Sequence, residues 1–137
     1  MKAIHIISFL ALIFLVGCQS PGFDEDILDK FYLGEEGKLT VYYFYGYSCP
    51  VCAQQSPFLD RLEEDFDVEI IKFEVYNRRD HQELFRAVAN EFGIEATGVP
   101  TTFIGDKYFV GFNERVGDRI VEEVENCLEN SCDERLK

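Results

Sequence analysis

The chain has 137 residues, a length typical of a single domain. Hydrophobic residues make up 47% of it and aromatic residues 15%, which is enough to build a core and excludes a disordered chain. Its 26 acidic and 13 basic residues give a formal net charge of -13, so nucleic acids and anionic lipid head groups are poor candidates for partners.

Residues 1–17 have the pattern of a signal peptide. Lys2 supplies a positive charge, and the apolar run after it is short for a membrane span, which needs ~20 residues. The run ends in Leu15-Val16-Gly17-Cys18, which resembles the lipobox of prokaryotic lipoproteins. In that family a signal peptidase cuts before the cysteine, which carries the lipid. The alternative is an uncleaved N-terminal anchor, and either one tethers the domain to the extracytoplasmic face of a prokaryotic membrane.

Residues 18–37 are predicted to form a tether and a short N-terminal helix, ahead of a domain at 38–137. Pro21-Gly22 breaks regular structure, and Asp24 can cap the helix. The predicted helix ends at Gly34 and Gly37 and carries four apolar or aromatic residues on one face: Ile27, Leu28, Phe31 and Tyr32.

An aromatic segment and a cysteine motif lie at the centre of the sequence. Residues 38–46 show no clear alternation, which predicts a central strand covered on both faces. Cys49-Pro50-Val51-Cys52 follows and opens a helical pattern that continues to about residue 66. Cys49 then occupies the N-cap, and Pro50 takes the first helical position, where its missing N–H costs nothing. The helix N-terminus favours a thiolate and lowers the pKa of Cys49 below ~8.5.

This spacing predicts a redox pair in which Cys49 attacks a substrate and Cys52, one turn further and more buried, resolves the product. Half of a zinc site and a purely structural disulfide are the alternatives for the motif alone.

The rest of the chain alternates strands and helices. A strand is predicted at 68–76, and Asp80 with Glu83 predicts a capped helix that Gly93 closes. Residues 101–104 and 107–110 form a predicted hairpin across Gly105-Asp106. A last helix starts near Asn113 and carries a predicted buried stripe of Val116, Ile120, Val121, Val124 and Leu128. The order β-α-β-α-β-β-α predicts an α/β fold, a four-stranded mixed sheet with helices on both faces.

Two cysteines remain at the end of the chain. Cys127 falls on the inward stripe of the last helix, and Cys132 lies just past Asn130, which can end that helix. A local disulfide between them is the favoured prediction, since an export route permits one. The alternatives are a buried free Cys127, a Cys132 that pairs with another chain, and a zinc site shared with the first pair. The topology disfavours the zinc site because it places the two pairs apart.

The element order, the CxxC at the end of the first strand and Val99-Pro100-Thr101 at the entry to the hairpin together resemble the thioredoxin-like superfamily. The resemblance covers residues 38–128, and Pro57 matches a proline that kinks the same helix in many thioredoxins. It implies a thioredoxin-like fold and a thiol–disulfide oxidoreductase. It also implies that Pro100 is cis and holds Val99 beside the sulfurs, where the Val99 backbone could pair with an extended substrate.

The sequence departs from the family near the motif. Tyr43 stands where thioredoxins carry an acid that helps to deprotonate the resolving thiol, and no histidine accompanies Pro50-Val51 as in strongly oxidising relatives. The direction of electron flow therefore stays open.

Residues 102–107 and Gly111 also resemble the glutaredoxin hairpin, where the following turn binds the glutathione carboxylate at a helix N-terminus. Here that turn is 111–114, and Glu114 would repel a carboxylate. A glutathione-dependent oxidoreductase is therefore an alternative function.

The sequence thus predicts a membrane-tethered enzyme that exchanges disulfides with exported proteins and needs no cofactor. Tyr47 is a candidate for an apolar docking surface near the motif. A membrane or soluble electron carrier must reset the cysteine pair. Two alternatives from other classes are a non-catalytic peptide-binding module and a metal-handling protein.

Overall fold

The computed structural model describes residues 25–28, 30–133 and 135–136. The predicted signal peptide, the predicted lipidation site Cys18 and the predicted helix cap Asp24 lie outside the described residues. No helix in the described ranges is long and apolar enough to cross a bilayer.

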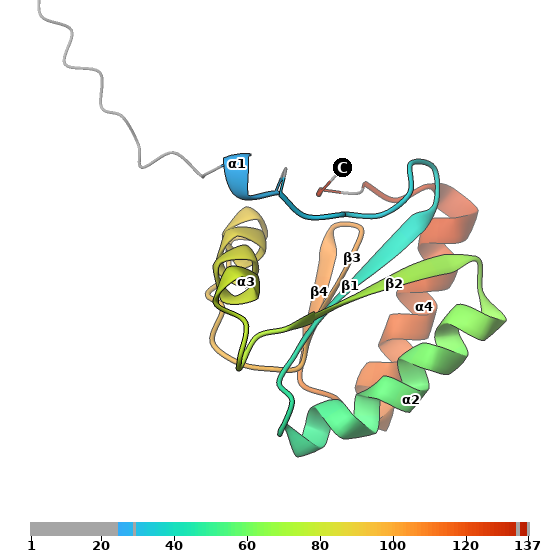
Figure 1. Ribbon diagram of the computed structural model, residues 1–137. Helices are drawn as coiled ribbons and strands as arrows, with labels where there is room; N and C mark the ends of the chain where they lie inside the picture. The colour runs from blue at the N-terminus through green and yellow to red at the C-terminus, as the bar shows by residue number, and fades with distance from the viewer. Residues whose placement is uncertain (1–24, 29, 134, 137) are drawn as a thin grey trace, which may run out of the picture.

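The elements follow the predicted order, with one short helix ahead of them (Figure 1). They are α1 (Glu25–Leu28), β1 (Leu39–Tyr45), α2 (Pro50–Asp65), β2 (Val68–Glu74), α3 (Arg79–Glu91), β3 (Thr101–Ile104), β4 (Lys107–Val110) and α4 (Glu114–Asn130).

The strands form one mixed sheet in the order β2-β1-β3-β4. β1 pairs with β2 in parallel, from Leu39 opposite Val68 to Tyr45 opposite Glu74. β3 runs antiparallel to β1, and β4 antiparallel to β3. Gly105 adopts a φ of 56° in the hairpin turn, a left-handed conformation that favours glycine. The predicted four-stranded mixed sheet is confirmed.

β1 is buried on both faces, as predicted, and its side chains alternate between two cores. Val41 and Tyr43 point to the core shared with α2 and α4, where Leu59 and Ile120 are fully buried. Tyr42 and Phe44 point to the opposite core, which α3 covers (Figure 1). The second core is largely aromatic: the Phe44 ring stacks on the rings of Phe73 and Phe85 at centroid distances of 5.0 and 4.7 Å.

Three details of the sequence prediction are wrong. α1 ends at Leu28, so Tyr32 is not helical and is 62% exposed. Asp80 does not cap α3. The helix begins at Arg79, so the N-cap is Arg78 and Asp80 lies inside the first turn, where its carboxylate pairs with the Arg78 guanidinium at 2.6 Å. On α4 the buried stripe continues from Ile120 and Val124 to Cys127, and Leu128 is 43% exposed because it falls one residue past that spacing.

Cys127 and Cys132 form a disulfide at the end of α4. The helix ends at Asn130, as predicted, and Ser131 turns the chain back with a left-handed φ of 56°. Both sulfurs pack against Gly105 in the β3–β4 turn, where a Cβ atom would overlap the Cys132 sulfur. This turn lies at the end of the sheet opposite to the carboxyl end of β1, so the two cysteine pairs are apart, as the topology predicted.

Removing this disulfide is predicted to destabilise the fold. The double substitution Cys127→Ser with Cys132→Ser opens a short loop and should lower the free energy of unfolding by about 2 kcal/mol. Urea denaturation followed by circular dichroism measures it. An unchanged urea midpoint would show that the packing of α4 on Gly105 is sufficient without the covalent bond.

Candidate active site

The cysteine motif lies where β1 leaves the sheet and α2 begins. Cys49 is the N-cap of α2, with an extended backbone at φ -86° and ψ 113°. Its sulfur accepts a hydrogen bond from the Cys52 N–H at 3.1 Å, and Pro50 takes the first helical position. The predicted cap is therefore confirmed. Cys49 and Cys52 are joined in a disulfide with their Cα atoms 5.2 Å apart.

The two sulfurs differ in access. Cys49 is 8% exposed and Cys52 is 2% exposed, while Val51 between them is 37% exposed. Cys49 is therefore the slightly more accessible residue of the pair. This order matches the predicted division into an attacking and a resolving thiol.

The segment before β3 forms the opposite wall of the site. The Val99–Pro100 peptide bond is cis, as the resemblance implied. The Val99 carbonyl oxygen lies 3.8 Å from the Cys49 sulfur. The Gly111 N–H donates to the Pro100 carbonyl at 2.8 Å and ties this segment to the end of β4. The structure thus places Val99 beside the sulfurs; its role in substrate binding stays a prediction.

Tyr43 lies beneath Cys52, on the face of β1 that α2 covers. Its hydroxyl donates a hydrogen bond to the Cys52 carbonyl at 3.0 Å, and its side chain is fully buried. This burial raises the pKa of Tyr43 above its ordinary value. The phenol is therefore neutral at neutral pH and acts as a donor, so it cannot accept a proton as the acid of thioredoxins does.

Gln55 is a buried polar residue that the sequence prediction missed. It lies one turn after Cys52 on α2 and is fully buried, and its Nε2 donates to the Thr102 hydroxyl at 2.7 Å. Its Oε1 has no hydrogen-bond partner among the described residues. The spacing could have indicated that Gln55 is buried, because it lies four residues before Leu59 and so shares the buried face of the helix.

Glu74 holds the loop before the motif against the loop after β2. Its carboxylate accepts backbone N–H bonds from Tyr47 at 3.1 Å, Tyr76 at 2.9 Å and Asn77 at 2.8 Å. Partial desolvation raises the pKa of Glu74, but these bonds from Asn77, Tyr47 and Tyr76 outweigh it and hold the pKa below its ordinary value. The Tyr76 ring also covers Gly46, where a Cβ atom would overlap it.

Two exposed aromatic side chains lie on the loops near the cysteine motif. Tyr47 is 83% exposed and Tyr76 51% exposed, on the two loops that Glu74 joins. This position suits the docking role predicted for Tyr47, which stays a prediction.

The turn predicted to resemble a glutathione-binding turn leads into α4. Asn113 caps α4 by accepting from the Val116 N–H at 3.0 Å, and Glu114 lies in the first turn of that helix. Within residues 25–28, 30–133 and 135–136, no group of three or more His, Cys, Asp or Glu side chains could hold a metal ion.

No family model matches the chain, and a search of curated proteins finds no match. Solved structures are similar to it. A reduced thioredoxin pre-protein of Schistosoma mansoni is 19% identical with a TM-score of 0.50, over 73% of this chain and 88% of that one. Thioredoxin f2 of Chlamydomonas reinhardtii is 21% identical with a TM-score of 0.50, over 75% and 92%. The chain has a thioredoxin-like fold.

A glutaredoxin of Archaeoglobus fulgidus is also similar, at 26% identity and a TM-score of 0.46, over 64% of this chain and 88% of that one. The four-stranded mixed sheet and its helices confirm the fold class that the sequence predicted.

Glu74→Gln is predicted to destabilise the chain at neutral pH only. The pKa of Glu74 is lower in the folded chain than in the unfolded chain, where a glutamate titrates at about 4. The ionised carboxylate therefore stabilises the fold at pH values above the unfolded pKa. This stabilisation is lost as the pH falls through the pKa of the folded chain. Urea midpoints of the two proteins should therefore differ at about pH 7 and converge in acid. Glu125→Gln, at an exposed position of α4, is the matched control. A difference that persists unchanged in acid would contradict the charged role.

Proposed function

We propose that this chain is a protein thiol–disulfide oxidoreductase. The observation that carries the proposal is the position of Cys49 at the N-cap of α2, where the Cys52 N–H donates to its sulfur and the Val99 carbonyl lies opposite. An N–H donor and the positive end of a helix stabilise a thiolate, the reactive form of a thiol. The similar thioredoxins support the fold that presents such a pair.

In the reducing direction, the Cys49 thiolate attacks one sulfur of a substrate disulfide. The substrate S–S bond breaks, a bond forms between Cys49 and the substrate, and the leaving thiolate takes a proton from water. Cys52 then loses its proton, attacks the Cys49 sulfur and releases the second substrate thiolate. Two electrons have moved to the substrate, and the Cys49–Cys52 bond remains. The same steps in reverse donate a disulfide, and a separate electron carrier resets the pair.

The proposed setting is the extracytoplasmic face of a prokaryotic membrane, with lipid on Cys18. The support is the sequence Leu15-Val16-Gly17-Cys18 at the end of a short apolar run. The Cys127–Cys132 disulfide is compatible with it, since stable disulfides form mainly outside the cytoplasm. The substrates would then be exported proteins.

Substitution of each active-site cysteine separates the enzyme from the alternatives. Cys52→Ser should accumulate a mixed disulfide between Cys49 and substrate, because the resolving thiol is missing. Cys49→Ser should form none and lose turnover. Non-reducing gels with mass spectrometry measure both. A Cys49→Ser protein with full activity would exclude the proposed chemistry, and retained peptide binding without any turnover in the wild type would favour a binding module.

The equilibrium redox potential of the pair fixes the direction of electron flow. Thiol buffers with alkylation mass shifts measure it. A value near ~ -270 mV, as for thioredoxin, makes the chain a reductant, and a value near ~ -120 mV, as for DsbA, makes it a disulfide donor. The absence of a reversible two-electron step would exclude both.

Lipid attachment is tested on the chain expressed in a bacterial host. The wild type should fractionate with membranes and carry a diacylglycerol-type mass at a mature N-terminal Cys18. Cys18→Ser should keep an uncleaved N-terminus and lose that mass. An identical N-terminus in both proteins would contradict the lipoprotein hypothesis.

A further inference from the structure

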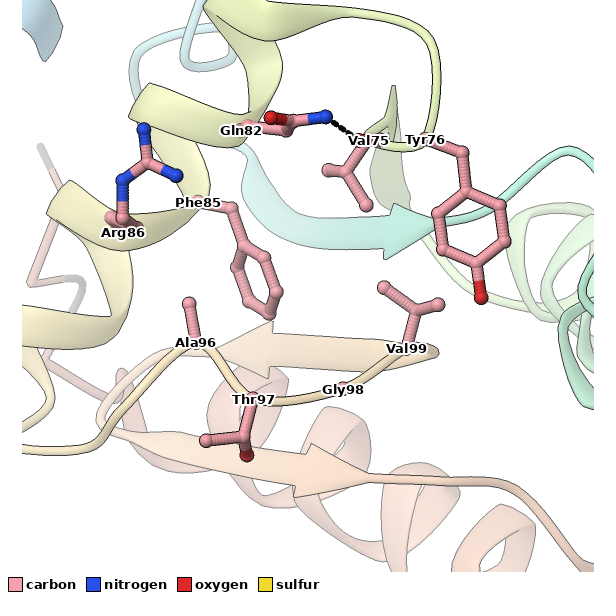
Figure 2. A pocket seen from close by; sticks show the side chains of 9 residues that line it. All are labelled: Val75, Tyr76, Gln82, Phe85, Arg86, Ala96, Thr97, Gly98 and Val99. Carbon is pink, nitrogen blue, oxygen red and sulfur yellow. Dashed lines mark hydrogen bonds between the residues drawn. The ribbon is translucent and has the colours of Figure 1, made fainter.

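A cavity of about 310 Å³ lies between α3, the end of β2 and the segment that leads to Pro100. Figure 2 shows the side chains that surround it. Its lining consists of Val75, Tyr76, Gln82, Phe85, Arg86, Ala96, Thr97, Gly98 and Val99.

The cavity lies beside the active site. Val99 lines it, and the carbonyl oxygen of the same residue lies 3.8 Å from the Cys49 sulfur. Tyr76 lines it from the other side and packs over Gly46, in the loop that leads to Cys49. A segment bonded to the Cys49 sulfur therefore has this cavity within reach on the other side of Val99.

The lining has an apolar floor and one polar end. Val75, Phe85 and Val99 point toward its interior, as Figure 2 shows, while Arg86 lies at the α3 side, away from Tyr76. The Gln82 Nε2 donates to the Val75 carbonyl at 2.6 Å, which fixes that amide in the wall. An apolar side chain fits the floor, and a group that reaches past it meets Arg86.

Arg86 is the only charged residue in this lining, in a chain with a formal net charge of -13. It is exposed, and it makes no salt bridge within the described part of the chain. The nearby acid Glu74 is occupied by three backbone N–H groups. The lining therefore carries one positive charge and no negative charge, whereas the chain as a whole is strongly negative.

We propose that this cavity binds the part of a protein substrate next to its reactive cysteine, with an apolar side chain on the Val75–Phe85–Val99 floor and an acidic side chain on Arg86. The inference rests on the proposed oxidoreductase function and adds a substrate class to it. Alternate side chains of an extended segment share one face, so an apolar residue next to the cysteine and an acid two positions beyond it both face the cavity. Arg86 is then a residue that determines specificity.

A protein segment fits this lining better than glutathione does. Glutathione carries carboxylates, but none of its side chains is apolar, so it would leave the floor uncovered. A protein segment covers the floor and can also meet the exposed ring of Tyr76 in the lining and that of Tyr47 outside it. Burial of apolar surface supplies affinity, while one exposed ion pair supplies a modest preference.

The experiment uses the reduced full chain in mild detergent and three probes. Two are peptide disulfides with leucine on both sides of the cysteine and, two positions beyond each leucine, either glutamate or lysine, so that both side chains lie on one face of an extended segment. The third is glutathione disulfide. Stopped-flow measurement gives the second-order rate constant for each probe with the wild type, Arg86→Glu and Arg61→Glu. Arg61 is an exposed arginine of α2 outside the cavity, so its substitution makes the same charge change elsewhere.

The wild type should react about fivefold faster with the glutamate peptide than with the lysine peptide, the size expected of one exposed ion pair. Arg86→Glu should reverse the preference, and Arg61→Glu should preserve it. Equal rates for the two peptides, or the same change in both variants, would overturn the inference. So would an effect of Arg86→Glu on glutathione disulfide alone, which would assign the cavity to glutathione.

Failure of the proposed function gives a different result. If the reduced wild type reacts with none of the three probes, the oxidoreductase hypothesis fails. If it reduces both peptides without regard to charge, the oxidoreductase hypothesis stands and only the role of Arg86 is lost.

Discussion

The hydrogen bond from the Cys52 N–H to the Cys49 sulfur is the interaction on which the site depends. This bond forms because β1 ends at Tyr45 and α2 begins at Pro50, which makes Cys49 the N-cap of the helix. β1 can fix this junction because it is buried on both faces and paired on both edges, by β2 and β3. The β3 pairing also brings Val99 to the same end of the sheet, although it is 50 residues from Cys49. The Cys49 sulfur is thus placed by a strand that is held on both faces and along both edges.

Local chemistry explains which features could be predicted from the sequence. The N-cap at Cys49 depends on a proline at the next position, the β3–β4 turn on Gly105, and the end of α4 on residues around Asn130. Each is decided by neighbours in the chain. The prediction that Asp80 caps α3 was wrong because the helix begins one residue before it, at Arg79.

The features that were missed depend on residues far apart in the sequence. Gln55 is paired with Thr102 across 47 positions, and Glu74 with Tyr47 across 27. The cavity beside Val99 is formed by residues from β2, α3 and the segment before β3 together. A pattern along the chain indicates that Glu74 is a strand residue and Arg86 a helix residue. Only the packed fold shows that one joins two loops and the other is the sole charge in a cavity.

The direction of β1 also sets the distance between the anchor and the chemistry. α1 and the C-terminal residues lie at the end of the sheet where β1 begins, whereas α2 begins near the other end (Figure 1). The seven residues of β1 span about 23 Å. Under the proposed lipid anchor at Cys18, the length of β1 separates α1, the first described element after the anchor, from the sulfurs. A redox partner of the proposed enzyme must therefore reach the end of the sheet that is far from α1.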